Sequence, residues 1–574
     1  ITILSYLGIV VGYVNKILLF PNFLSEEQVG LANILVSMAV MYAQFSAMGI
    51  NSTIVKFFPF FRTADKRHNG LFFWSALGVS VGFVLFTALF LIFREPVTEY
   101  YAQKSPLLSK YYLLLIPLGF TTLFFNFFTA WLQALYKTVV SSFVYEVALR
   151  LLVTAEISLY ALGAIDFEQF IVGYVLIYFV PTLVLLVYTL WTRRIDLRPV
   201  WTGRTRRLLS VAAVYGLWQY LGGTSMYIVP VIDQSMLAGM RGLAQQAVYS
   251  TMAYMVAAML TPYRSMIKVA TPVVTNLWKE RDMEGMRRIS REMSLVNLIV
   301  GSFLFLLIWV NLDNIFSLMP GSYSDGRYVF LFLGLARVMD MYSGLNGTIL
   351  VTSKKYRYDF TFSLMLVALT VASNALLIPR WGMTGAALAT MITVLAYNAI
   401  RIASVWKFYR IQPFALSDLL VVALAAGCIG ASALVPPMGH FIADGLIRSA
   451  LVAALQTLED HARADFTAVR LSLPTSLAAC PKAGERVRAV FHTQRTPVEN
   501  AMTLGVVHTN TKLTFAPLIP GSLQSIGDDA YAAEFDASRL AAVIEYAGRY
   551  MLALGGRFAD GQPFAGLAET EFFK

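Results

Sequence analysis

The chain has 574 residues and a formal net charge of +11, yet only 14% of its residues are charged, 57% are hydrophobic, and the mean hydropathy is +0.63. Because about a quarter of the residues of a soluble domain are charged, this composition excludes an ordinary soluble enzyme, and we predict no nucleic-acid partner. The two cysteines, Cys428 and Cys480, lie far apart in unlike surroundings, so the sequence predicts neither a disulfide framework nor a metal site.

Apolar runs of about 18–25 residues follow one another to about residue 440, each long enough to cross a hydrocarbon core of about 30 Å as a helix. They indicate an all-α polytopic membrane protein. The chain opens with ITILSYLGIV, without an initiator Met or a signal-peptide cleavage site, which we interpret as a truncated first span. The predicted spans are 3–20, 31–50, 71–93, 111–135, 139–163, 168–191, 208–231, 246–263, 293–311, 328–351, 359–378, 384–406 and 417–437.

The connections between the spans alternate in charge. About 22 Lys and Arg residues fall on one side and about 6 on the other, and the basic side of a membrane protein is cytoplasmic. This bias predicts a multi-pass protein with its N-terminus in the cytoplasm. The basic connections are 62–68, Lys137, 193–207, 264–291, 353–359 and 407–410, and the outer ones are 25–30, 94–110, the loop around Arg241, 311–327 and 379–385.

A long basic connection at 192–207 divides the spans into two halves that echo one another. NKILLFPNFLSEEQVGLANI, from Asn15, and DQSMLAGMRGLAQQAVYSTM, from Asp233, each have a polar pair within a helix, a short outer loop and a Gln at the same offset, Gln28 and Gln246. An even number of helices in each half makes such repeats parallel, related by an axis along the membrane normal. We therefore predict two six-helix lobes in a pseudo-symmetric arrangement.

Three segments carry a resemblance to a known family: YLGIVVGYVNKILLFPNFLSEEQVGLANILVS, MGINSTIVKFFPFFR and PRWGMTGAALATMITVLAYNAIR. Together with a GxxGAAxA element (Gly382, Gly385, Ala386, Ala387, Ala389), they resemble bacterial oligosaccharide and polysaccharide flippases over residues 1 to about 440. These flippases are the Wzx-type branch of the multidrug/oligosaccharidyl-lipid/polysaccharide exporter superfamily.

The resemblance implies six plus six helices, two extra C-terminal helices, and alternating access in the bacterial inner membrane. It implies an O-antigen-type or capsule-type oligosaccharide on undecaprenyl pyrophosphate as cargo, moved from the cytoplasmic to the outer leaflet. The expected partners are this lipid-linked oligosaccharide and the membrane lipids, with the glycan polymerase machinery as a further candidate. We place the N-terminal lobe at 1–200, the C-terminal lobe at 201–410 and the extra helices at 411–456.

Charged residues within the spans are the candidate functional residues, because an ionisable side chain at a helix centre in hydrocarbon costs about 2.5–3.5 kcal/mol and faces a partner or a wet cavity. Cations suit a pyrophosphate headgroup. The candidates for headgroup contact are the deep cations Lys16, Arg150, Arg337 and Arg401, and, near the cytoplasmic face, Lys56, Arg264 and Lys268. The alternatives are ion pairs within a helix, Glu146 with Arg150 and Arg337 with Asp340, and snorkelling of the near-face cations.

Asp233 is the strongest candidate for ion coupling. It lies at the outer end of the seventh predicted span, three residues after Pro230, where a bent helix would expose backbone carbonyls. A lone carboxylate there could bind Na⁺ or take up a proton, and the alternative is a hydrogen-bonded structural Asp. Glu156 is the second candidate, and no other cofactor, metal site or catalytic residue is predicted. Other polar span residues suit either sugar hydroxyls or interhelical contacts: Asn126, Gln133, Gln219, Tyr220, Asn346 and Asn398.

After Pro437 the sequence changes character. A weak apolar run containing Asp444 and Arg448 is a poor fourteenth span, and the C-terminus is cytoplasmic only if it forms. Residues 457–574 predict a small soluble α+β segment with strands in FTAVRLSLP, ERVRAVFHT and NAMTLGVVHTNTKLTFAPL and an amphipathic helix over 538–554. Its origin is open between a native domain and a gene-assembly fusion.

Among the function classes, a secondary transporter fits best. The runner-up is a cation-coupled multidrug exporter of the same superfamily, favoured if the cavity is acidic. A membrane glycan polymerase or ligase fits less well, because it needs a large outer catalytic loop and the outer connections are short. No Gly-rich phosphate loop followed by Lys-Ser/Thr is present, so we predict gradient-linked transport by a protein that is not an enzyme.

Overall fold

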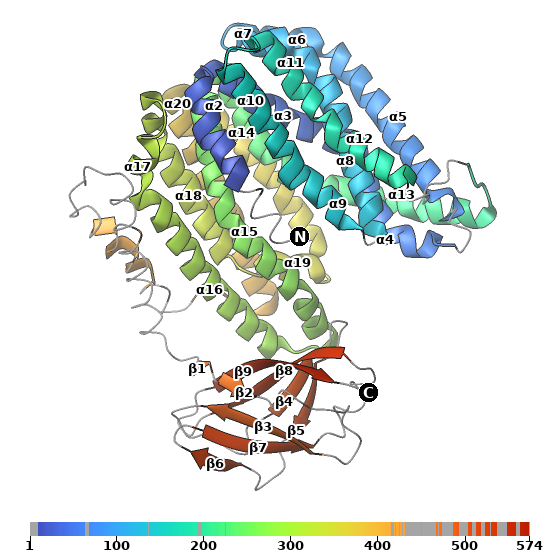
Figure 1. The fold of residues 1–574 in the computed structure, drawn as a ribbon, viewed down its shortest axis with the longest axis vertical. Helices are drawn as coiled ribbons and strands as arrows, with labels where there is room; N and C mark the ends of the chain where they lie inside the picture. The colour runs from blue at the N-terminus through green and yellow to red at the C-terminus, as the bar shows by residue number, and fades with distance from the viewer. Residues whose placement is uncertain are drawn as a thin grey trace. The chain divides into compact units, whose positions relative to one another are not determined.

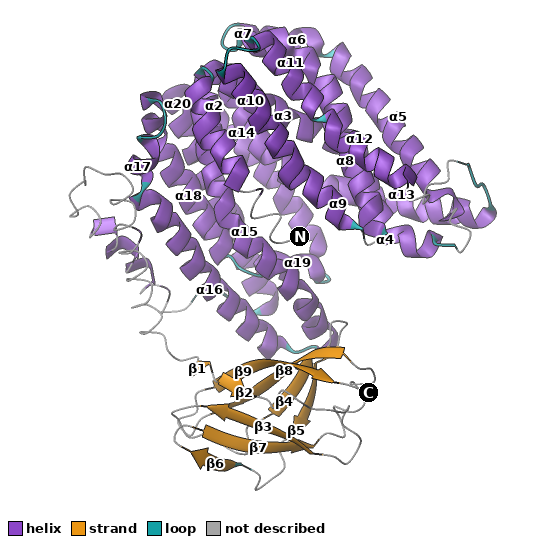
Figure 2. Ribbon diagram, in the orientation of Figure 1, coloured by secondary structure: helices purple, strands orange, loops and turns teal. Residues whose placement is uncertain are grey.

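The fold is that of a computed structural model of the whole chain. It describes residues 8–414 except 9, 64–67, 136, 192–197 and 224, scattered positions between 418 and 449, and the strands and residue 523 between 467 and 572. The chain divides into two compact units, Ile1–Ala453 and Ala454–Lys574. The described elements of the first unit are helices and those of the second are strands (Figure 1 and Figure 2).

The helices of the first unit are those of a multi-pass membrane protein. Among the described residues, seven helices are long and apolar enough to cross a membrane. The number is eight if the bent pair Gly321–Tyr342 and Asn346–Thr352 is one span. The predicted span 417–437 and the candidate fourteenth span fall largely outside the described residues, as does the start of the first span.

The first lobe holds two features that shape its interior. α3 begins where Ser25 and Gln28 form a capping box, which satisfies free backbone N–H groups at its start. The second span then breaks at Met48 and Gly49, both in the left-handed region, so that α4 leaves α3 at a new angle. The elements are η1 (Val14–Leu19), α2 (Phe20–Phe23), α3 (Glu26–Ala47), α4 (Ile50–Phe61), η2 (His68–Gly70), α5 (Leu71–Ile92), α6 (Arg94–Ala102), α7 (Pro106–Tyr111), η3 (Tyr112–Leu114), α8 (Leu115–Ala134), α9 (Thr138–Phe143), η4 (Val144–Ala148), α10 (Leu149–Ala161), α11 (Phe167–Ile177) and α12 (Phe179–Trp191).

The second lobe has longer helices than the sequence predicts. The loop expected around Arg241 is reduced to Gly242, whose φ of 98° links the end of α14 to the start of α15. Pro230 lies inside α14 and does not end it. The elements are α13 (Gly203–Gly223), α14 (Ser225–Arg241), α15 (Leu243–Glu280), α16 (Met283–Val310), α17 (Leu312–Phe316), η5 (Gly321–Gly326), α18 (Arg327–Tyr342), α19 (Asn346–Thr352) and α20 (Tyr356–Tyr409).

α20 contains two spans folded back on each other. Its 54 residues would make a straight helix of about 80 Å, more than twice the thickness of a hydrocarbon core. Gly382 interrupts it at φ 55° and ψ −133°, a conformation that glycine alone adopts readily. Side-chain contacts across the turn, Ser373 with Thr393 and Asp359 with Arg401, show that the two halves lie antiparallel. The two predicted spans 359–378 and 384–406 are therefore joined by a turn rather than by a loop.

The two lobes meet along α3 and α15, the corresponding helices of the two halves. The Asn33 amide donates to Ser250 Oγ at 2.9 Å, and Ser37 Oγ donates to the Gln234 side chain at 2.9 Å. Nearer the outer connections, the Asn22 side chain donates to the Leu318 carbonyl at 2.9 Å. Figure 1 shows α6 and α7 at this outer end and α4 at the other. The Asn22–Leu318 contact joins the lobes at the end that the charge pattern predicts to be the outer one.

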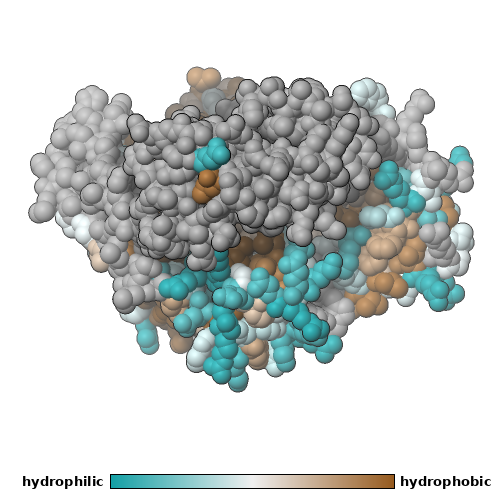
Figure 3. Space-filling view, turned by 90° about the horizontal axis from the view of Figure 1, so that it is seen from below, coloured by the Kyte–Doolittle hydropathy of each residue, from teal (hydrophilic) through white to brown (hydrophobic). Residues whose placement is uncertain are grey.

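The opposite end of the helices carries much of the basic charge. Among the described connections, it receives the start of α16, the residues between α19 and α20, and the end of α20. Figure 3 views the molecule from this end and shows hydrophilic side chains gathered on the described surface that the grey atoms leave visible. This distribution agrees with the alternation of charge along the sequence.

The second unit consists, in its described residues, of two sheets with strand orders β1-β9-β8-β4-β5 and β2-β3-β7-β6. The helix predicted over 538–554 is wrong for residues 548–554, which belong to β8, and 538–547 lie outside the described residues. Because β8 pairs with both β4 and β9, its short apolar run forms a central strand, a pattern that periodicity does not separate from a helix. The strands are β1 (Thr467–Ala468), β2 (Arg470–Ser472), β3 (Arg486–His492), β4 (Thr503–Val507), β5 (Leu513–Pro517), β6 (Gln524–Gly527), β7 (Ala530–Asp536), β8 (Gly548–Arg557) and β9 (Pro563–Phe572).

Candidate functional site

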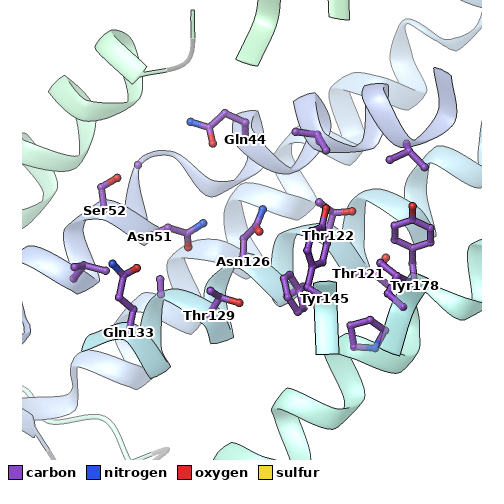
Figure 4. Close-up of a pocket in the computed structure, with 18 of the residues that line it drawn as sticks. Gln44, Asn51, Ser52, Thr121, Thr122, Asn126, Thr129, Gln133, Tyr145 and Tyr178 are labelled. Atoms are coloured by element: carbon purple, nitrogen blue, oxygen red, sulfur yellow. The ribbon is translucent and has the colours of Figure 1, made fainter. Parts of the chain in front are cut away.

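A cavity of about 990 Å³ opens within the first lobe. α3, α4 and α8 supply most of its wall, and Tyr145, Tyr178 and Tyr215 complete it (Figure 4). The helix break at Gly49 places the first turns of α4 against this space. Gly49 packs on the backbone of Gly216 in α13 so closely that a Cβ would lie 2.1 Å from the Gly216 carbonyl oxygen. The glycine is therefore needed both for its backbone conformation and for this contact.

The cavity wall is rich in side-chain amides and hydroxyls. Figure 4 shows them in a row that runs from Ser52 and Gln133 at one end to Tyr178 at the other. On α8 the polar positions follow a helical stripe at spacings of four, three and four residues: Thr122, Asn126, Thr129 and Gln133. Among the described residues that line the cavity, Lys56 is the one charged side chain, and its Nζ lies 3.7 Å from the centre of the Tyr215 ring.

Lys16 lies beside α3 and α11 without a carboxylate partner among the described residues. Its Nζ donates to Asn33 Oδ1 at 2.5 Å and lies 4.5 Å from the centre of the Phe20 ring. Asn33 in turn donates to Ser250 of the second lobe, so the ammonium group is one hydrogen bond away from the contact between the lobes. Lys16 is therefore a half-buried cation that contacts polar and aromatic groups, without a carboxylate to neutralise it among the described residues.

Arg150 forms an ion pair on its own helix, Nη2 to Glu146 Oε2 at 2.7 Å, as the alternative for this residue predicted. Its Nη1 is buried and has no hydrogen-bond partner among the described residues. The guanidinium packs against Gly12 of the first helix, where a Cβ would lie 3.2 Å from Nε. Nη2 of Arg150 is therefore paired with a carboxylate, whereas Nη1 has no hydrogen-bond partner among the described residues.

A second cavity, of about 400 Å³, lies within the second lobe and contains five charged side chains: Asp233, Arg337, Asp340, Asp359 and Arg401. Arg337 Nη1 lies 3.2 Å from Asp340 Oδ2, the ion pair given above as the alternative. Arg401 Nη2 lies 3.0 Å from Asp359 Oδ1, across the α20 hairpin. The two predicted headgroup arginines of this cavity are thus paired with carboxylates, and Asp233 remains as an acid without a basic partner among the described residues.

Asp233 is buried within the protein rather than close to the membrane–water interface. Its carboxylate accepts hydrogen bonds from Asn374 Nδ2 at 2.6 Å, Thr390 Oγ1 at 2.7 Å and Tyr249 OH at 3.2 Å. The predicted position at the outer end of a span is wrong, because α14 continues eight residues further, to Arg241. Asn374 and Thr390 belong to opposite halves of the α20 hairpin, so both halves contact the carboxylate. The Oδ1 atom of Asn374 is buried and has no hydrogen-bond partner among the described residues.

The remaining candidates lie apart from these cavities. Glu156 is buried, its Oε1 packs against Gly173, and its Oε2 has no partner among the described residues. Arg264 and Lys268 are exposed on α15 and make no ion pair with a described residue. The described residues contain no group of three or more His, Cys, Asp or Glu side chains that could hold a metal.

Comparison with known proteins shows what the chain is similar to. Residues 1–278 match the family described as "Polysaccharide biosynthesis protein". The capsular polysaccharide biosynthesis protein CapF of Staphylococcus aureus is 22% identical over 180 residues, which are 31% of this chain and 44% of CapF.

The fold is similar to the folds of two solved membrane proteins. The lipid II flippase MurJ, in an inward closed conformation, has a TM-score of 0.62 at 12% identity, covering 80% of this chain and 98% of MurJ. The inward-facing conformation of a multidrug resistance MATE family transporter of the MOP superfamily has a TM-score of 0.52 at 15% identity, covering 71% and 96%. The resemblance drawn from the sequence is confirmed, as is the two-lobed helical fold.

Sequence reasoning missed several residues that the fold brings together. Asn126 and Gln133 were named, but Gln44 and Asn51, which join them in the first cavity, were not. Asp359 was not paired with Arg401, because 42 residues separate them and only the hairpin brings them into contact. The polar stripe on α8 is a signal that the sequence does contain, since its spacing puts all four residues on one face of an otherwise apolar span.

Proposed function

We propose that the protein is a secondary transporter that flips an oligosaccharide linked to undecaprenyl pyrophosphate from the cytoplasmic to the outer leaflet. The observation that carries this proposal is the character of the first cavity, whose described wall has amides, hydroxyls and one lysine but no carboxylate. A carboxylate in the wall would favour a cationic drug, whereas a saccharide on a phosphate requires hydrogen-bonding groups and a cation. The match of residues 1–278 to a family described as "Polysaccharide biosynthesis protein" supports the same cargo.

The cations proposed to contact the headgroup differ between the two lobes in whether a carboxylate already pairs with them. Lys16 and Lys56 have no carboxylate partner among the described residues, and Arg150 keeps one free Nη1, so these three can add a phosphate contact without losing an ion pair. Arg264 and Lys268 are exposed and make no ion pair with a described residue, which suits first contact from the cytoplasmic side. Arg337 and Arg401 would have to leave Asp340 and Asp359.

Purified full-length protein in nanodiscs is expected to bind undecaprenyl pyrophosphate, and Lys56→Met is expected to weaken this binding about tenfold. Lys110→Met is the matched control, because Lys110 is an exposed lysine that makes a surface ion pair with Glu168 at 3.6 Å. Equal binding by wild type and Lys56→Met would remove Lys56 from the site, and absence of binding by the wild type would contradict the proposed function.

We propose that Asp233 couples transport to an ion gradient. The second cavity holds three Asp and two Arg side chains, so one negative charge remains after the two ion pairs form. The carboxylate, Thr390 Oγ1 and the unpartnered Asn374 Oδ1 are hard oxygen atoms that fit Na⁺, and the carboxylate also fits a proton. The same acidic balance favours the runner-up, a cation-coupled multidrug exporter.

Replacement of Asp233 tests the coupling. Asp233→Asn is expected to remove the dependence of transport on a Na⁺ or H⁺ gradient, because the amide has the shape of the carboxylate but no charge. Its one oxygen keeps the hydrogen bonds on one side of the group only. The control is Asp340→Asn, in which the negative charge lost is one already neutralised by Arg337. Transport by Asp233→Asn that follows the gradient as wild type does would contradict this role.

A further inference from the structure

Four side-chain amides in the first cavity have no partner in the described protein. Gln44 lies on α3, Asn51 on α4, and Asn126 and Gln133 on α8, and none of the four makes a hydrogen bond to a described residue. Asn126 and Gln133 are exposed although they sit in a spanning helix. An exposed amide without a partner costs several kcal/mol in lipid, so these side chains face a space that holds water or a polar ligand.

Two polar atoms of this wall, one of them in Asn51, are buried and have no hydrogen-bond partner among the described residues. Asn51 Oδ1 and Thr129 Oγ1 have almost no accessible surface and no hydrogen-bond partner among the described residues. Nearly all buried polar atoms of native proteins are hydrogen-bonded, so orphaned atoms in a cavity wall indicate a missing ligand. Figure 4 shows the side chains of Asn51 and Asn126 close together in the middle of this wall.

The chemistry of the wall matches a neutral saccharide. An Asn or Gln side chain offers a donor and an acceptor side by side, which suits neighbouring hydroxyl groups of a sugar ring. Phe125 and Tyr145 stack at 5.1 Å between ring centres and give the cavity an apolar face, as the C–H face of a sugar requires. The volume of about 990 Å³ is at the upper end of the range of about 300–1,000 Å³ for ligand pockets.

We propose that this cavity is the glycan subsite of the transporter and that it takes uncharged sugars adjacent to the pyrophosphate. The subsite rests on the proposed function, since it assigns one part of the lipid-linked cargo to one part of the first lobe. Lys56 is the only charged described residue in the wall, so it contacts the pyrophosphate and leaves no cation for an acidic sugar. Selectivity therefore favours neutral or N-acetylated sugars over uronic acids.

The test compares two probes on the full chain in nanodiscs: undecaprenyl pyrophosphate without sugar and the same lipid carrying a neutral disaccharide. The wild type is expected to bind the glycosylated lipid about tenfold more tightly or better. The double variant Asn126→Leu/Gln133→Met is expected to lose this advantage and to bind the bare lipid as wild type does. The control is Gln103→Met, an exposed amide in the outer connection.

The outcomes separate the subsite from the proposed function. Equal affinity of the wild type for the two lipids, or an unchanged advantage in the double variant, overturns the subsite and leaves the proposed function standing. Binding of neither lipid by the wild type overturns the proposed function itself. If the double variant does not fold, the single variant Gln133→Met provides the same comparison. Replacing the neutral disaccharide by one with a uronic acid is expected to lower affinity, and equal affinity for the two would overturn the predicted selectivity.

Discussion

Lys16 differs from the other deep cations because no described carboxylate neutralises it. Polar and aromatic groups alone offset only part of the free energy that desolvation of the Lys16 ammonium costs. A lysine at this position therefore indicates a functional role rather than a contribution to stability. Lys16→Met is expected to leave the melting temperature unchanged or raised and to lower transport at least tenfold. A parallel measurement of melting temperature and flipping, with Lys110→Met as control, checks this. A lower melting temperature with normal transport would show that Lys16 is structural.

Arg337 represents the opposite case, a cation whose ion pair with Asp340 contributes to the fold. Arg337→Ala leaves the half-buried Asp340 without its charge partner, with the Asn398 amide as its remaining hydrogen-bond donor. We expect a loss of about 1 kcal/mol of stability, most of it recovered in Arg337→Ala/Asp340→Asn. Thermal unfolding of the two variants measures both values. Equal destabilisation of the single and double variants would contradict the pairing, and transport lost in both would assign Arg337 a further role in the cargo site.

At the scale of elements, the turn at Gly382 determines how the second lobe is built. Its backbone conformation is accessible to glycine and strained for other residues by about 1–3 kcal/mol, and a Cβ would lie 2.4 Å from Gln245 Oε1. Gly382→Ala is therefore expected to lower the melting temperature. Gly203→Ala is the matched control, because Gly203 starts α13 with no atom within 4 Å of its Cβ position and is expected to be neutral. Equal melting temperatures for both variants would contradict the strained turn.

The sequence predicts these helices better than it predicts their contacts. Hydrophobic length and loop charge locate the spans, because lipid imposes both. They do not locate the break at Gly49, the hairpin at Gly382 or the position of Asp233 deep inside α14, since each depends on which helices pack together. The polar wall of the first cavity likewise combines residues from α3, α4 and α8, and only the stripe on α8 is visible in the sequence. In the second unit, a short apolar run around 548–554 was assigned to a helix because periodicity alone does not reveal its two neighbouring strands.

At the scale of the whole molecule, the contact between the lobes at the predicted outer end indicates that transport requires this end to open. Asn22 of α2 contacts Leu318 of the second lobe at this end. In a background lacking Cys428 and Cys480, Asn22→Cys/Leu318→Cys joined by a short bis-thiol reagent is expected to stop flipping, and cleavage of the link is expected to restore it. Each single cysteine variant with the same reagent is the control. Transport by the linked protein at the wild-type rate would exclude alternating access through this end.

The most direct test of the account is transport by the full chain in liposomes, with an undecaprenyl-pyrophosphate oligosaccharide and a cationic dye measured side by side. A secondary transporter of lipid-linked sugar is expected to move the oligosaccharide when an ion gradient is present and to leave the dye where it was loaded. Export of the dye without movement of the oligosaccharide would contradict the account and identify the protein as a cation-coupled multidrug exporter.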